Sequence, residues 1–513
     1  MSTLTAQVFG YSQADRVIVP PPTEPMSVAR EVIRALYTAP KGVILRDHRG
    51  DLHRWSGTCW PELELRDVRS AVYQFLERAQ YVQSTDGLKS FAPNRKKIDD
   101  VVDALRAIVL LDSAAKAPTW NPFNDDPPAA QVVSMANGLL HVPTRTLLPH
   151  TPRFFTHHSL PFPFEVDAPA PSAWLEFLQQ LWADDPSSIA TLQEVMGYVL
   201  GGDTRLQKIF LLVGPKRAGK GTIGRVITGL LGGHNVAAPT LANLATNFGL
   251  QPLINRPLAL ISDARLSSRG DGKIVVERLL SISGEDSLTI DRKHRDPWTG
   301  RLPTRFVVMT NELPRLSDAS GALASRFILL VLTKSFYGGE DVRLADRLLS
   351  EAPAIFNWAL QGLDRLNARG HFVNPESGVE AIQQLEDLSS PVLAFIRNAC
   401  QVGPFEVEVG RLWRAWKAWC ESDNRYAGTR EVFGRDLRAA VPTVRRVRAR
   451  SDDGRTYTYV GIALRTADQR QGPADPGPPG SDHRRGPGGP RTDSYAGPLE
   501  AELDTDGAND VER

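Results

Sequence analysis

The sequence predicts an α/β protein with a parallel sheet at its centre and a smaller unit on each side. Three observations support this class. Residues 206–332 alternate short apolar strands with helices, which is the pattern of a parallel sheet. Within that segment a glycine-bounded loop joins a strand directly to a helix. Residues 385–465 show helical periodicity followed by an alternating basic hairpin.

The segment before the sheet divides into two units. Residues 1–115 form an N-terminal α+β domain, with helical periodicity and a hairpin around Arg49-Gly50-Asp51. No chemistry-bearing pattern occurs there, so its role stays open. Residues 130–200 begin with short strands broken by proline and end in two helices, near 172–182 and 187–200.

The remaining boundaries follow from composition. The sheet and the helices after it cover 201–370, and the small basic unit covers 385–465. The tail, 466–513, differs in kind, because 12 of the 19 residues from Gly472 to Pro490 are Gly or Pro. Such a segment buries too little apolar surface to offset its ordering entropy, so we expect disorder.

The glycine-bounded loop carries the strongest chemical signal. It follows an apolar strand at 209–213 and opens a helix, and it reads Gly214-Pro215-Lys216-Arg217-Ala218-Gly219-Lys220-Gly221-Thr222. Glycines let backbone N–H groups wrap a phosphate chain at a helix N-terminus. We therefore expect ATP here, with Lys220 on the β- and γ-phosphates and Thr222 on Mg²⁺. Gly221 stands where a serine or threonine usually follows the lysine. Small nucleotide kinases have the same GKGT sequence, so the loop alone leaves the enzyme class open.

Three polar residues follow in order along the same predicted sheet. Asp263 ends the apolar strand 257–263 and is a candidate second Mg²⁺ ligand. Asn311 ends the strand 304–311, where an amide can orient an attacking water; the alternative is a capping asparagine. Arg326 precedes another apolar strand, and an arginine there could stabilise transition-state charge on a neighbouring copy's nucleotide or form a surface ion pair.

The order of these motifs resembles a known family. GPKRAGKGT, LALISDARL, SISGEDSLTIDRKHRDP and FVVMTNELPRLSDASGALASRF resemble the A, B, B′ and C motifs of superfamily 3 helicases. They are most similar to the helicase part of phage and plasmid primase-helicases related to the poxvirus type. The segment from Ala136 to Glu165 resembles the region before the helicase in those proteins, so the resemblance covers roughly 135–465.

The resemblance implies an AAA+-type ATPase that assembles into a ring, usually hexameric, and moves along single-stranded DNA, usually 3′ to 5′. It implies the sensor role for Asn311 and the arginine-finger role for Arg326. Many relatives carry a second acid after the aspartate, whereas this chain has Ala264. The water-activating base is therefore open, with Glu285 and Asp286 as acids close in sequence.

Two basic segments are candidate DNA contacts. The family places a pore loop just before the sensor strand, where residues 287–305 read as a hairpin with a turn at 296–300 and basic residues Arg292, Lys293, His294, Arg295, Arg301 and Arg305. Among these we expect DNA contacts from Arg292, Lys293 and His294.

The second candidate lies in the C-terminal unit, which resembles a winged helix. Its hairpin, with a turn at Asp453-Gly454, presents Arg446, Arg448 and Arg450 on one strand face. From 409 to 465 the chain has 13 Lys and Arg against 6 Asp and Glu, a local charge of +7, while the whole chain carries only +1. The alternative for both hairpins is an ordinary solvated basic surface.

Together these features predict an ATP-dependent DNA helicase acting in the replication of a phage or similar mobile element. Expected partners are single-stranded and forked DNA, further copies of the chain in a hexameric ring, and other replication proteins. The alternatives are an ATP-dependent origin-binding or assembly protein without unwinding activity and a P-loop nucleotide kinase.

Two absences in the sequence complete the expectation. We expect no primase activity, because residues 1–115 are short for a polymerising domain and the Asp125-Asp126 pair lies in a proline-flanked loop. We expect no membrane partner and a cytoplasmic location, since no secretory signal or stretch of ~18 apolar residues occurs. Three scattered cysteines fit a reducing compartment.

Overall fold

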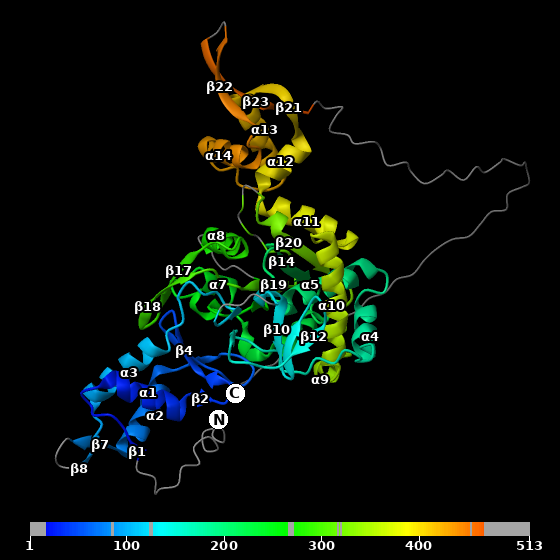
Figure 1. The fold of residues 1–513 in the computed structure, drawn as a ribbon. Helices are drawn as coiled ribbons and strands as arrows, with labels where there is room; N and C mark the ends of the chain where they lie inside the picture. Colours follow the sequence, from blue (N-terminus) through cyan, green and yellow to red (C-terminus); the bar gives the residue numbers. More distant parts are fainter. Residues whose placement is uncertain are drawn as a thin grey trace, which may run out of the picture. The chain divides into compact units, whose positions relative to one another are not determined.

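The computed structural model describes residues 17–465 except 84–86, 123–126, 265–270, 315, 317, 319–320 and 452–453. The expected disordered tail and the Asp125-Asp126 pair therefore lie outside the described residues. The fold is mixed α/β with a parallel sheet, as predicted (Figure 1). Within the described part, no helix is both long and apolar enough to cross a lipid bilayer.

The N-terminal domain packs three helices against short strands. The helices are α1 (Pro25–Leu36), α2 (Leu65–Glu77) and α3 (Arg95–Ile108). The strands are β1 (Val17–Ile18), β2 (Thr38–Ala39), β3 (Gly42–Val43), β4 (Leu45–His48), β5 (Asp51–Arg54), β6 (Glu62–Leu63), β7 (Ala79–Gln83) and β8 (Gly87–Ser90). The hairpin expected around Arg49-Gly50-Asp51 is confirmed: both turn residues have positive φ, 54° and 84°, and His48 pairs with Asp51.

A linking region connects this domain to the central sheet. Its strands are β9 (Thr119–Trp120), β10 (Val132–Met135), β11 (Gly138–His141), β12 (Thr146–Leu148) and β13 (Phe154–Phe155), with the short helix η1 (Ala129–Gln131). Two predicted helices follow, α4 (Ser172–Leu181) and α5 (Pro186–Leu200). The N-cap of α5 is Asp185, whose carboxylate accepts a hydrogen bond from the Ser188 N–H at 3.0 Å.

The central sheet has five parallel strands in the order β15-β16-β19-β14-β20. The strands are β14 (Ile209–Val213), β15 (Val236–Ala237), β16 (Leu258–Ile261), β19 (Arg305–Thr310) and β20 (Phe327–Val331). The surrounding elements are α6 (Lys220–Leu231), η2 (Gly233–Asn235), α7 (Leu241–Leu244), η3 (Gln251–Leu253), α8 (Asp271–Ser283), the hairpin β17 (Leu288–Arg292) and β18 (Arg295–Gly300), η4 (Ala324–Arg326), α9 (Leu344–Leu349), α10 (Ala352–Arg369) and α11 (Glu376–Ser389).

The strand β14 is apolar on both faces, because helices cover both sides of the sheet. Phe210 and Leu212 of β14 pack into a core shared with α4, α5, α6 and α10. Ile209 and Leu211, on the opposite face, pack with residues of α7 and α8. The alternation of successive side chains therefore divides one strand between two cores, which accounts for its uninterrupted apolar sequence.

The hairpin before β19 differs from the sequence prediction. We expected its turn at 296–300, but these residues belong to β18, and Arg292 pairs with Arg295 so that Lys293 and His294 form the turn. Trp298 pairs with Ile290, and both are buried against the sheet. Burial of the Trp298 side chain aligns the two strands so that Trp298 lies opposite Ile290. The sequence prediction placed the turn at 296–300 because this segment contains Pro297. Pro297 is tolerated because the two-stranded ribbon has open edges.

The C-terminal unit contains three helices and an antiparallel sheet. The helices are α12 (Pro391–Ala399), α13 (Val409–Ser422) and α14 (Arg430–Ala440), and the sheet order is β21 (Cys400–Glu408), β23 (Gly454–Leu464), β22 (Arg445–Ser451). Thr429 caps α14 by accepting from the Val432 N–H at 3.4 Å. Gly454, which we expected in the turn, belongs to β23 and pairs with Ser451, and Asp453 lies outside the described residues.

Candidate functional site

The carboxyl ends of three neighbouring strands gather the predicted site residues. β14 ends at Val213, which pairs with Thr310, the last residue of β19, so the glycine-bounded loop and Asn311 leave the sheet side by side. β16 lies on the other side of β19, and Asp263 follows it at the same edge. Ligand sites of parallel sheets occur at this edge, where the loops after the strands meet.

Lys220 contacts both the glycine-bounded loop and the residue that follows β19. Its Nζ donates to the carbonyl oxygens of Gly214 and Pro215, both at 2.7 Å, and to Asn311 Oδ1 at 3.1 Å. These three acceptors are uncharged, and burial lowers the pKa of the Lys220 ammonium. The loop thus places a partly desolvated positive charge at the start of α6, where an anion is favoured.

Two glycines of the loop are required by its close packing. A Cβ on Gly214 would lie 2.3 Å from the carbonyl oxygen of Leu332. Gly219 has φ +88°, and a Cβ there would meet the Leu181 side chain at 2.8 Å. The backbone therefore curls against β20 and α4 in a shape that only glycine allows at these positions. Pro215, Lys216, Arg217 and Ala218 complete the loop before α6, and Gly221 is the second residue of that helix.

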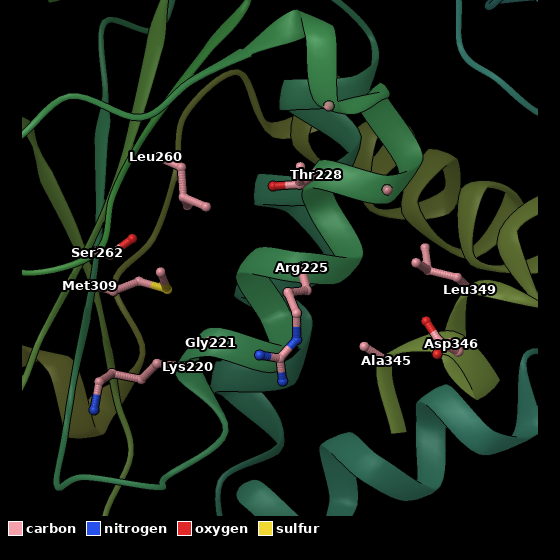
Figure 2. Close-up of a pocket in the computed structure, with 12 residues that line it drawn as sticks. Lys220, Gly221, Arg225, Thr228, Leu260, Ser262, Met309, Ala345, Asp346 and Leu349 are labelled. Carbon is pink, nitrogen blue, oxygen red and sulfur yellow. The ribbon is translucent and has the colours of Figure 1, made fainter. Parts of the chain in front are cut away.

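A cavity of 560 Å³ lies beside Lys220 and runs along α6 (Figure 2). Figure 2 shows Ser262, which directly follows β16, and Met309 of β19 on one side of α6, and Asp346 of α9 on the other. Arg225 also lines the cavity, and its Nη2 donates to Thr222 Oγ1 at 3.2 Å. The cavity is therefore continuous with the loop and carries both charged and apolar walls.

Thr222 and Asp263 carry side-chain oxygen atoms of the kind expected of magnesium ligands. The Thr222 hydroxyl is buried at the start of α6, and the Asp263 carboxylate is exposed at the same sheet edge. Both offer the oxygen donors that Mg²⁺ prefers. The Thr222 hydroxyl already accepts a hydrogen bond from the Arg225 guanidinium. A metal ion bound to this hydroxyl would take the place of that guanidinium group.

Arg326 and Glu285 lie at the opposite edge of the sheet. Arg326 directly precedes β20, and its Nη1 donates to Ser283 Oγ at 2.7 Å and to the Leu280 carbonyl at 2.5 Å, both in α8. Glu285 accepts from the hydroxyl of Thr204, which precedes β14. The five residues of β14 separate this edge from the loop by roughly 16 Å at about 3.3 Å per residue. Neither side chain is positioned near the chain's own Lys220.

The first basic hairpin is only partly available as a DNA-binding surface. Lys293 and His294 are exposed, and they lie at the turn of the hairpin, which we had expected at 296–300. Arg292, in contrast, is buried in an ion pair with Asp51, 2.6 Å from Nη1 to Oδ2, a contact that local sequence patterns do not predict. Arg305 is also buried: it donates to the carbonyls of Val199 and Asp203, and burial lowers its pKa to about 10. Arg305 therefore caps the end of α5 and does not face DNA.

The second basic hairpin exposes two of its predicted arginines on one face. The register pairs Arg446 with Tyr459 and Arg448 with Tyr457, so these four side chains share that face. The Arg446 guanidinium carbon lies 4.0 Å from the Tyr457 ring centroid, a cation–π contact. Sequence reasoning missed Tyr457, although the alternating Tyr-Thr-Tyr sequence signals it. The side chain of Arg450 lies outside the described residues.

Two family models match this chain. Residues 30–183 match the model described as D5 N terminal like, a domain found in primase-helicase proteins. Residues 212–326 match a family of unknown function, DUF5906, and this range runs from β14 to Arg326. The first match begins well before residue 135, so the similarity extends into the N-terminal domain, beyond the range that the sequence motifs indicated.

Solved structures of the NrS-1 C-terminal region are similar over most of the chain. The A form of the apo region matches with a TM-score of 0.46 and 12% identity, covering 80% of this chain and 94% of that one. The apo structure of its residues 305–718 matches with a TM-score of 0.46 and 11% identity, covering 86% and 99%.

Proposed function

We propose that this chain is an ATP-dependent DNA helicase of superfamily 3 that acts in the replication of a phage or similar mobile element. The observation that carries the proposal is the Lys220 ammonium, held by uncharged oxygens of the loop and by Asn311 at the carboxyl edge of a parallel sheet. The match to the D5 N-terminal-like model supports the replication setting. The sheet order, with β19 between β14 and β16, supports an AAA+-type core.

The site residues divide the chemistry of ATP hydrolysis between them. Hydrolysis of ATP would supply the free energy for movement along DNA. A bound Mg²⁺ would neutralise part of the negative charge on the phosphates. Lys220 and the loop N–H groups bind the phosphate chain, while Thr222 and Asp263 hold the metal directly or through water. Asn311 orients the attacking water, because its amide oxygen already lies 3.1 Å from the lysine that marks the phosphate position.

The position of Arg326 supports a ring. An arginine at the amino edge of the sheet is too far from its own loop to reach the same nucleotide. It can serve only a nucleotide held by a second copy, whose carboxyl edge faces this amino edge. Such a head-to-tail contact between unlike surfaces closes into a ring when the rotation is right, and a hexamer is the size we propose.

DNA binding in this proposal uses two exposed hairpin surfaces. Lys293 and His294 lie at the turn of the β17–β18 hairpin, and Arg446 and Arg448 lie on β22 of the winged-helix-like unit. Arginines and lysines on extended hairpins contact backbone phosphates without reading sequence. Tyr457 adds an aromatic ring on the same face as Arg446, where it can stack on an unpaired base.

The deciding experiment measures ATP hydrolysis with and without single-stranded DNA, and fork unwinding, on one preparation. We expect DNA-stimulated hydrolysis and strand separation, and we expect Lys220→Ala to reduce both at least about 100-fold, since it removes the phosphate-binding charge. Lys96→Ala, at an exposed lysine of α3, is the control and should behave as wild type.

Other outcomes of this experiment identify the alternatives. DNA-stimulated hydrolysis without unwinding at ring-forming concentrations would favour an origin-binding or assembly protein. Phosphoryl transfer to a nucleoside monophosphate, indifferent to DNA, would favour a nucleotide kinase. Normal hydrolysis by Lys220→Ala would overturn the assignment of the phosphate loop.

A further inference from the structure

The β17–β18 hairpin is bound to the N-terminal domain through a cluster of ion pairs. Arg292 Nη1 lies 2.6 Å from Asp51 Oδ2, and Arg295 Nη1 lies 3.3 Å from Asp51 Oδ1 and 2.5 Å from Glu62 Oε1. The Arg292 and Asp51 side chains are only 8% and 12% exposed, whereas those of Arg295 and Glu62 are each 44% exposed. The cluster therefore has a buried pair at its centre and a solvated pair at its rim.

The cluster is built from matching positions on two small sheets. Asp51 opens β5 after the Arg49-Gly50 turn, and Glu62 lies on β6, which pairs with β5. On the other side, Arg292 and Arg295 pair across the turn of the hairpin. Two carboxylates on adjacent strands thus meet two guanidinium groups on adjacent strands.

A second contact supports the same interface. The Arg49 guanidinium carbon lies 5.9 Å from the centroid of the Trp298 ring in β18. A Cβ on Gly300 would come within 2.7 Å of Arg49 Nη1, so glycine there allows the close approach. The hairpin is therefore held by charge at its turn and by an aromatic contact nearer its base.

The chemistry of the cluster matches that of a phosphodiester backbone. Guanidinium groups bind carboxylates and phosphates with the same hydrogen-bond donors, and both ligands are anionic oxygens. The arginines flank the exposed turn residues Lys293 and His294, which the proposed function places on DNA. Removing a carboxylate from a buried pair leaves an uncompensated charge, which another anion can stabilise.

We propose that Arg292 and Arg295 form a phosphate-binding site for the nucleic-acid backbone, and that Asp51 and Glu62 occupy this site until DNA displaces them. The N-terminal domain thereby acts as an electrostatic latch on the hairpin. This inference rests on the proposed function, because it names the regulation of the same DNA-binding hairpin. It also assigns a role to a domain in which the sequence shows no chemistry.

The test compares the affinity of full-length variants for a fluorescent oligo-dT strand, without nucleotide, over a range of NaCl concentrations. We expect Asp51→Asn with Glu62→Gln to bind at least about tenfold more tightly. Its log–log salt slope should steepen by about 1.4, because two further phosphates are contacted at about 0.7 per phosphate. The control is Asp67→Asn with Glu77→Gln, two exposed acids of α2 whose loss changes the net charge equally.

Two further variants make the result decisive. Adding Arg292→Gln and Arg295→Gln to the latch variant should abolish the gain in affinity and slope. Glu62→Gln alone, at the solvated rim, guards against misfolding and should give part of the gain. Binding no tighter than the charge control, or a gain that survives loss of both arginines, would overturn the latch.

The outcome is independent of ATP hydrolysis. A gain that depends on the two arginines, in a protein that fails to unwind DNA, would support the latch and reject the helicase. Unwinding of DNA without that gain in affinity would support the helicase and reject the latch.

Discussion

At the scale of single residues, the site depends on how side chains are desolvated. Lys220 keeps its charge among uncharged oxygens and has its pKa lowered by burial, so phosphate oxygens are the favourable additional ligands. Arg305 also carries a basic side chain, but its guanidinium donates hydrogen bonds to the carbonyls of Val199 and Asp203 at the end of α5. The residue type alone did not separate these two roles, because burial and hydrogen-bond partners decide them.

His158 gives a pH-dependent prediction at this scale. Burial, together with the nearby positive charges of Arg305 and Arg256, lowers the pKa of His158 from 6.5 to about 3. Among the described residues its Nδ1 has no hydrogen-bond partner. The unfolded chain therefore binds this proton first as pH falls, so stability is full above about pH 6.5 and declines toward pH 3.

Between pH 7 and pH 5 this one group should remove about 2 kcal/mol from the free energy of unfolding. Urea denaturation at the two pH values measures the loss, and His158→Gln should reduce it by about that amount. His371→Gln, at an exposed histidine, is the control variant. An unchanged pH dependence in His158→Gln would contradict the prediction, because it would mean that folding does not change the proton affinity of this imidazole.

At the scale of elements, the two basic hairpins differ in what covers them. The β17–β18 hairpin has its arginines paired with carboxylates, whereas Arg446 and Arg448 of β22 are exposed and lie beside an aromatic ring. Unpaired surface arginines on an extended hairpin are better placed for phosphates. If both proposals hold, β22 therefore contributes the larger share of DNA affinity while the β17–β18 hairpin is paired with the N-terminal domain.

Arg446→Gln with Arg448→Gln should weaken binding to oligo-dT about 10- to 100-fold at low salt. The log–log salt slope should fall by about 1.4, because two phosphate contacts are lost. A salt titration of fluorescence anisotropy measures both quantities. Arg66→Gln with Arg95→Gln, at exposed arginines of the N-terminal domain, is the charge-matched control. Equal effects of the two double variants would show that only net charge matters.

At the scale of the whole molecule, the residues of the proposed ATPase site are divided between the two ends of the strands of the central sheet. The carboxyl edge holds the loop, Asn311 and Asp263, and the amino edge holds Arg326 about one strand length away. A single chain cannot bring these parts together across its own sheet. In the proposed function, the complete site therefore consists of parts from two copies in head-to-tail contact.

Mixing two inactive variants tests this arrangement. Lys220→Ala and Arg326→Ala should each lose hydrolysis alone, whereas a 1:1 mixture should recover about a quarter of wild-type activity, because some interfaces join an intact loop to an intact arginine. Steady-state ATP hydrolysis after co-assembly measures the recovery. A mixture as inactive as its components, with assembly verified by sedimentation, would contradict action across the interface.

Much of the central fold could be predicted from local sequence. The strands β14, β16 and β19 and the glycine-bounded loop were located because apolar runs, glycines and helix periodicity are encoded within a few residues. The turn of the β17–β18 hairpin was predicted wrongly, since the buried pairing of Trp298 with Ile290 sets its register. That burial depends on the sheet beneath, which the hairpin's own sequence does not reveal.

The sequence by itself determined the kinds of residue at the site and the order in which they follow the strands. Only the tertiary structure decided which of them meet: Asn311 contacts Lys220 across 91 positions, and Arg292 is paired with Asp51 across 241. The physical reason is that strand order and domain contact arise from burying surfaces that are distant in sequence. Local periodicity specifies that a surface must be buried, but not which partner buries it.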